Sequence, residues 1–153
     1  MDTHRIDSQK LIYHPKRVAD WVEGKNIYPL YIEISPCGGC NHRCIFCALD
    51  YLGYEATSLK AKTLKGFLKE ISMNGVKSVM FAGEGEPLLH KDIAELVAYA
   101  RSYNLDVAIT TNGVLLSAEL TEKILPELSW LRISLNAGTD KTYSIIHETR
   151  PED

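Results

Sequence analysis

The sequence predicts an α/β fold, a partial parallel (β/α) barrel with about four β-α units. Two observations indicate it: strand-like and helix-like stretches alternate four times after residue 29, and the strands keep polar residues on one face. Such alternation requires parallel strands with right-handed helical crossovers. Alternation alone also fits an open doubly wound sheet. The polar strand face favours a barrel-like cleft, because an open sheet covered by helices on both sides is apolar on both faces.

Four strands are expected at residues 30–35, 77–83, 106–112 and 131–136. The first alternates between apolar and polar residues, and the second is apolar throughout, as in a strand buried on both faces. In the fourth, Leu131, Ile133 and Leu135 are expected to face the helices. Ser134 and Asn136 then lie on the opposite face. Ligands of either architecture bind at the carboxyl ends of the strands.

Helices are expected between and before these strands, from apolar spacing and capping residues. A short helix over residues 15–23 ends at Gly24, and residues 83–90 form a loop. The other helices are marked by these residues: Leu64, Phe67, Leu68 and Ile71 before Asn74-Gly75; Ile93, Leu96, Val97 and Ala100; Ser117 as cap before Pro126; and Thr139 or Asp140 as cap before Tyr143 and Ile146.

Composition indicates an ordinary globular domain. The chain has 153 residues, of which 45% are hydrophobic and 24% charged, and its net charge is -3. That charge argues against nucleic acid and anionic membranes as partners. No apolar run spans a bilayer, and the first residues lack the apolar stretch of a secretory signal. The expected location is the cytoplasm, where thiols stay reduced.

All four cysteines fall in the segment PCGGCNHRCIFCA, residues 36–48. Cys37, Cys40 and Cys44 read C-x2-C-x3-C, whereas Cys40, Cys44 and Cys47 read C-x3-C-x2-C. Structural zinc joins two cysteine pairs that lie further apart in sequence, whereas short cysteine runs are typical of iron–sulfur clusters. An iron–sulfur cluster is therefore favoured over zinc or a redox thiol pair. Spacing alone does not choose between the two triads.

CNHRCIFC, residues 40–47, resembles the cluster loop of the radical S-adenosylmethionine (SAM) superfamily, with Phe46 before the last cysteine. GEGEP, residues 83–87, is similar to the family loop that holds the methionine amino group of SAM. TTNG (110–113) and SLNAG (134–138) resemble its third- and fourth-strand endings. The resemblance covers residues 29–149.

The resemblance implies a metalloenzyme of the oxidoreductase type with an external one-electron donor such as flavodoxin or ferredoxin. Its cofactors are a [4Fe-4S] cluster and SAM, which is cleaved to a 5′-deoxyadenosyl radical that abstracts hydrogen from substrate. It assigns Cys40, Cys44 and Cys47 as iron ligands, and Cys37 is then not a ligand of the cluster. The SAM-binding residues that it implies are Phe46, Gly83, Gly85, Glu86, Pro87, Asn112, Ser134 and Asn136.

Each assignment has a simpler rival. Glu84 and Glu86 also suit a helix N-terminus, and Asn112-Gly113 reads as a turn. His42 lies between two cysteines and is either a metal ligand or, as favoured here, a solvent-facing loop residue, while His90 and His147 receive no role. Tyr51, Tyr54 and Lys60 either shape a pocket rim or lie on plain surface.

Two parts are expected: a lead-in with a short helix at 1–28, and a radical SAM core at 29–153 that is incomplete against the six β-α units usual in the family. The open barrel edge is expected either to make the chain less stable than a version with further β-α units or to let it associate with itself. The substrate and the catalytic residues stay unassigned. The alternative functions are an electron-transfer iron–sulfur protein without SAM chemistry and a zinc-stabilised binding module.

Overall fold

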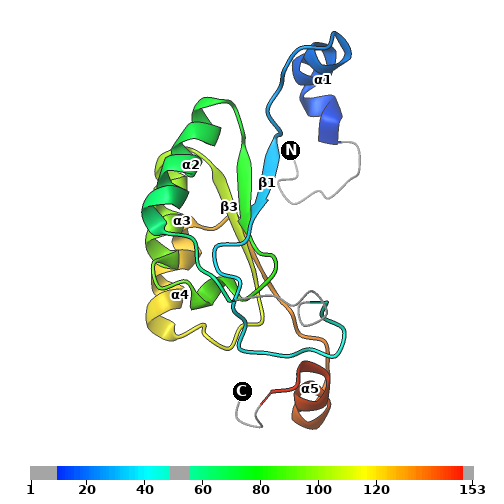
Figure 1. Ribbon diagram of the computed structural model, residues 1–153, viewed down its shortest axis with the longest axis vertical. Helices are drawn as coiled ribbons and strands as arrows, with labels where there is room; N and C mark the ends of the chain where they lie inside the picture. Colours follow the sequence, from blue (N-terminus) through cyan, green and yellow to red (C-terminus); the bar gives the residue numbers. More distant parts are fainter. Residues whose placement is uncertain (1–9, 49–55, 150–153) are drawn as a thin grey trace.

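Four parallel strands form one sheet in the order β1-β2-β3-β4, as the alternation predicts. The computed structural model describes residues 10–48 and 56–149 (Figure 1), so Tyr51 and Tyr54 lie outside it. The strands are β1 (Tyr31–Ile34), β2 (Ser78–Phe81), β3 (Asp106–Thr111) and β4 (Trp130–Ile133). Each pairs in parallel register with the next in sequence, which is the strand order of an unclosed β/α barrel.

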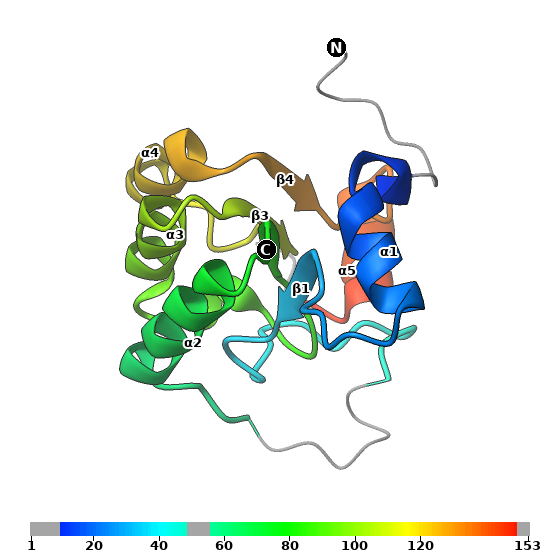
Figure 2. The same cartoon turned by 90° about the horizontal axis from the view of Figure 1, so that it is seen from above.

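Helices α2 (Ala61–Met73), α3 (Ile93–Ser102) and α4 (Ala118–Ile124) cover one face of the sheet (Figure 2). On the other side lie α1 (Pro15–Val22), near the amino ends of the strands, and α5 (Asp140–His147), near their carboxyl ends. Short 3-10 turns complete the described chain: η1 (Lys10–Tyr13), η3 (Pro87–Leu89) and η4 (Leu125–Glu127). No helix within the described ranges is long and apolar enough to cross a membrane.

The core lies between the sheet and α2, α3 and α4. Leu68, Leu96, Val97 and Ala100 are fully buried there, as the helical spacing predicts. Phe67 is an exception, because its side chain is 39% exposed. It lies beside the buried stripe of α2 rather than within it, so the prediction that it faces the core is wrong.

The opposite face of the sheet has only a small apolar cluster, made of Met80, Ala82 and Ala108. The hydroxyl of Thr110, next along this face of β3, donates to the sulfur of Met80 at 3.3 Å. The two alanines in the middle of this face and the polar side chains at its carboxyl end leave room for a ligand. This agrees with the polar strand face expected from the sequence.

Capping residues fix the helix ends where the sequence places them. Ser117 accepts a hydrogen bond from the amide of Leu120 at 3.1 Å, and Thr139 caps α5 by accepting from the amide of Thr142 at 3.3 Å. Gly75 follows α2 with φ +86°, a conformation that favours glycine.

The end of β4 differs from the expectation. The strand stops at Ile133, so residues 134–136 lie beyond it. Leu135 is 72% exposed and Ile133 is 49% exposed, whereas Leu131 packs against the core. The prediction that Leu135 is covered by helices is therefore wrong, because β4 is an edge strand of the described sheet.

Among the described residues of the lead-in, Arg17 bonds to the core. The guanidinium of Arg17 in α1 donates to the carbonyl of Tyr28, and also to that of Gly75 at 3.0 Å. This arginine joins α1 to the start of β1 and to the end of α2. The boundary between lead-in and core near residue 28 stays a prediction.

Candidate functional site

A cavity of about 470 Å³ lies at the carboxyl ends of the strands. This volume is within the range of small-molecule and cofactor sites. All of the predicted site residues line it except Pro87, which is buried in η3. Five further residues line it as well: His42, Ala48, Thr110, Thr111 and His147.

The structure separates Cys37 from the other three cysteines. Cys40, Cys44 and Cys47 line the cavity, whereas Cys37 is buried outside it. The sulfur of Cys37 accepts a hydrogen bond from the hydroxyl of Ser58 at 3.2 Å, and the two residues form an isolated antiparallel bridge. Cys37 thus packs the exit of β1 against the segment before α2.

The cavity thiols are partly buried and close enough to influence one another. Burial raises the pKa of the Cys40 thiol, against a weaker opposing effect of the His42 amide, which donates to its sulfur at 3.4 Å. Burial also raises the pKa of Cys44, followed by the negative charges that Cys40 and Cys47 would carry as thiolates. Three thiolates here repel one another, and a positively charged metal centre relieves this repulsion. The donor set therefore fits a thiolate-bound metal centre.

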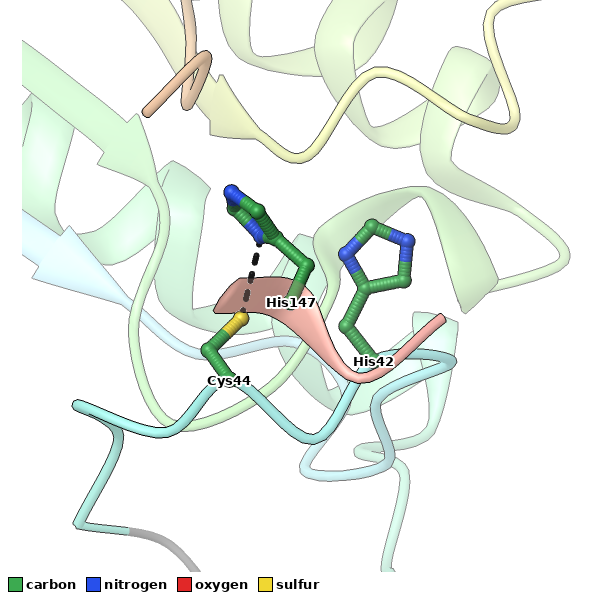
Figure 3. A group of neighbouring side chains, drawn as sticks. All are labelled: His42, Cys44 and His147. Atoms are coloured by element: carbon green, nitrogen blue, oxygen red, sulfur yellow. Dashed lines mark hydrogen bonds between the residues drawn. The ribbon is translucent and has the colours of Figure 1, made fainter. Parts of the chain in front are cut away.

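Helix α5 holds the middle of the cysteine loop. The amides on either side of Cys44 donate to the last turn of α5: Arg43 to the carbonyl of His147 at 3.1 Å, and Ile45 to that of Ile146 at 2.9 Å. The sulfur of Cys44 also lies 3.2 Å from Nδ1 of His147 (Figure 3). Cys44 is thus positioned by residues far along the chain.

Two histidines line the cavity, although His42 was expected to face solvent and His147 had no assigned role. His42 is only 2% exposed, so its assignment as a solvent-facing loop residue is wrong. His147 is 1% exposed, and burial lowers its pKa, with a smaller effect from His42. The position of His42 between two cysteines was a usable signal. His147 had none, since it follows Cys44 by 103 residues.

Glu86 is buried at the base of the cavity and accepts three hydrogen bonds. Its Oε1 accepts from the amide of Leu88 at 3.0 Å and from the hydroxyl of Thr111 at 2.7 Å. Its Oε2 accepts from the amide of Asn112 at 2.8 Å. A carboxylate has about four acceptor positions, so one remains for a ligand donor. The simpler reading, a carboxylate beside a helical N-terminus, also holds, because Glu86 caps η3.

Glycines let the second strand-end loop pack on the cysteine loop. A Cβ on Gly85 would lie 2.7 Å from the carbonyl oxygen of Gly39 and would also collide with that of Cys37. Gly83 has φ +110°, and a Cβ there would meet the Cβ of Ser35 at 2.8 Å. The resemblance assigns both glycines to SAM binding, and both line the cavity. The space that a Cβ would take at each is occupied by the chain's own backbone and side chains.

Asn112 joins the third strand-end loop to the cysteine loop. Its Nδ2 donates to Oδ1 of Asn41 at 2.8 Å, and its own Oδ1 accepts from the amide of Val114 at 3.1 Å. The second bond is that of an Asx turn, so the turn reading and the cavity position both hold. Phe46 lies at the mouth, 62% exposed, with its ring edge-on to His147 at 5.8 Å between centroids.

The loop after β1 carries three thiols into a cofactor-sized cavity at the strand ends, an arrangement that suits a metal-cofactor protein with a partial β/α barrel. The chain belongs to the radical SAM superfamily, whose family model matches residues 34–153. The cofactors that the resemblance implied, a [4Fe-4S] cluster and SAM, are those of this family. Its matched relatives are enzymes.

Individual relatives agree with this family. GTP 3′,8-cyclase of Chlorobaculum tepidum is 34% identical over 125 residues, 80% of this chain and 38% of that protein. Fe-coproporphyrin III synthase of Methanosarcina barkeri is 32% identical over 99 residues, 63% of this chain and 25% of that protein. The crystal structure of Streptococcus suis SuiB bound to S-adenosylmethionine superposes with a TM-score of 0.72 at 28% identity, over 97% of this chain and 35% of that one.

The chain spans less than two fifths of the length of each of these proteins. The names of these relatives describe different reactions. The similarity therefore supports a shared cofactor-binding part and assigns no substrate.

Proposed function

We propose that this chain is the cofactor-binding part of a radical SAM enzyme, with Cys40, Cys44 and Cys47 holding a [4Fe-4S] cluster. The observation that supports it best is that these three cysteines line one cavity together with the strand-end residues. Cys37 lies outside the cavity and accepts a hydrogen bond from Ser58. When bound, the cluster supplies the electron that cleaves SAM to a 5′-deoxyadenosyl radical, which takes hydrogen from substrate.

The chain's own residues bind and orient SAM in this proposal. The remaining acceptor position of Glu86 suits the SAM ammonium group, a charge-assisted hydrogen bond. Ser134 and Asn136, which line the cavity beyond β4, supply polar groups for the ribose hydroxyls or the carboxylate. Phe46 offers an apolar surface for the adenine at the cavity mouth.

Radical SAM enzymes take a substrate and a reductant, and the electron donor proposed here is a flavodoxin or a ferredoxin. SuiB has been crystallised with its precursor peptide, whereas the substrate of this chain stays open. We place the reaction in the cytoplasm, because reducing conditions keep three cavity thiols available for iron.

Anaerobic reconstitution with iron and sulfide, followed by dithionite and SAM, tests the proposal. The expected result is one four-iron cluster per chain and formation of 5′-deoxyadenosine. Cys40→Ala, Cys44→Ala and Cys47→Ala should each abolish cluster assembly, and Cys37→Ala should keep it. Loss of the cluster in folded Cys37→Ala would contradict the ligand assignment. A reducible cluster without 5′-deoxyadenosine would favour the electron-transfer function, and stoichiometric zinc without iron uptake would favour the binding module.

A further inference from the structure

His42, Cys44 and His147 form a second candidate donor set inside the cavity (Figure 3). One donor atom from each of them lies within 4.8 Å of the others. Both histidines are almost fully buried, and Cys44 is half-buried. Only Cys44 belongs to the three cysteines assigned to the cluster, so the donor set has a different composition and a different chemistry.

Packing on α5 fixes the two imidazole rings. The ring of His147 stacks on Tyr143, one helical turn earlier, with centroids 4.1 Å apart and planes at 19°. The ring of His42 lies edge-on to both, at 5.9 Å from Tyr143 and 5.4 Å from His147. The amides beside Cys44 also bond to α5. Helix α5 therefore contacts or contains all three donor residues.

The geometry is close to that of a tetrahedral zinc site. Zinc bonds of about 2.3 Å to sulfur and 2.0 Å to nitrogen place two ligand atoms about 3.5 Å apart. The sulfur of Cys44 and Nδ1 of His147 are 3.2 Å apart, near that separation. His42 needs to approach by at most about 1.5 Å, a side-chain adjustment. All three residues line the cavity, so the fourth position opens onto it.

We propose that the chain without its cluster binds one divalent ion of the zinc class through His42, Cys44 and His147, with the fourth position open to water. Two imidazoles and one thiolate are a ligand set that zinc and cobalt(II) accept. This goes beyond the proposed function, because it defines a second metal state of the same loop. The ion and the cluster exclude each other, since both need the sulfur of Cys44.

Titration of the metal-free, reduced chain with cobalt(II) under anaerobic conditions tests this site. The expected result is one cobalt per chain, with a sulfur-to-cobalt charge-transfer band and the intense visible bands of tetrahedral coordination. His42→Phe and His147→Phe keep an aromatic ring in each packing position but remove the donor. Each should weaken cobalt binding at least about tenfold, and Cys44→Ala should remove the charge-transfer band.

Cys40→Ala and Cys47→Ala serve as matched controls, because they remove cavity thiols outside the donor set. Both should bind cobalt as the parent chain does. Unchanged binding in the two histidine variants, or loss of binding in Cys40→Ala or Cys47→Ala, would overturn the proposal by assigning the ion to the cysteines. His147→Gln and His42→Gln supply a second pair of variants if a phenylalanine variant fails to fold by circular dichroism.

Cluster assembly on the same variants separates this proposal from the proposed function. Cluster assembly requires the thiols of Cys40 and Cys47, whereas cobalt binding does not, so these two variants separate the two metal states. Zinc added before iron and sulfide should slow cluster formation in the parent chain and have little effect in His147→Phe. Equal slowing in both chains would overturn the proposal even if the cluster forms as expected.

Discussion

The carboxylate of Glu86 accepts a 2.7 Å hydrogen bond from the hydroxyl of Thr111, and both residues are buried. Glu86 comes from the loop after β2, and Thr111 is the last residue of β3. The same hydroxyl accepts from the amide of Gly113 at 3.0 Å. The carboxylate therefore joins two strand-end loops, besides offering a position to a ligand.

Replacing Thr111 by valine should lower the free energy of unfolding by about 2 kcal/mol, because a buried carboxylate loses a donor and the Gly113 amide loses its acceptor. Urea denaturation measures this change. Thr63→Val, on the exposed side of α2, is the matched control and should change stability by at most about 0.5 kcal/mol. Equal effects of the two substitutions would show that the bond between the loops adds no stability.

Gly85→Ala should destabilise the chain by about 3 kcal/mol or more, because the new methyl group meets backbone atoms of the cysteine loop. The control is Gly66→Ala in the middle of α2, where a Cβ meets nothing within 4 Å. That substitution should stabilise by about 0.5–1 kcal/mol, since alanine loses less backbone entropy in a helix. Thermal unfolding of both variants checks the opposite signs, and a stable Gly85→Ala chain would contradict the described packing.

Cys37→Ala should separate stability from metal binding. The buried sulfur and its bond from Ser58 are lost, at a cost of about 1–2 kcal/mol in unfolding free energy, whereas iron content after reconstitution stays at the parent level. Cys47→Ala should show the reverse, with little change in stability and no cluster. Iron analysis and urea denaturation on the same samples decide between the two patterns.

Self-association should depend on the exposed apolar residues near the edge strand β4. Trp130, Ile133 and Leu135 are 47%, 49% and 72% exposed, and β4 pairs only with β3 in the described sheet. Leu135→Lys should shift sedimentation velocity profiles toward the monomer, because an edge charge opposes pairing between chains. Met73→Lys, at a 75% exposed position on α2, should leave the profile unchanged. A parent chain that is monomeric at all concentrations would refute the expected association.

The fold was predictable because its signals are local. The buried run before Gly83, the Asn74-Gly75 helix end and the Ser117 cap each lie within a few residues of the structure that they specify. The predictions that were wrong concerned residues whose burial depends on contacts that are distant in sequence or missing from the described sheet. Leu135 alternates like a buried strand residue, yet it stays exposed beyond β4 in the described sheet.

The site was predictable to the extent that its residues follow strands. Cys40, Glu86, Asn112 and Ser134 each come after a different strand, and parallel strands bring their carboxyl ends together. Local pattern does not reveal which charges are already satisfied, so the three internal donors to Glu86 were not foreseen. It also does not reveal that α5 returns to the cysteine loop, which is why His147 was missed.

The return of α5 to the cysteine loop also orders events during synthesis. Cys44 leaves the ribosome about a hundred residues before the carbonyls of Ile146 and His147 that hold its neighbours, a separation that makes this contact a late one in folding. Until then the amides beside Cys44 lack these acceptors. Iron delivery to a nascent chain therefore meets a loop without its final shape around Cys44, and a stop before residue 146 leaves all four cysteines but not the helix end that holds Cys44.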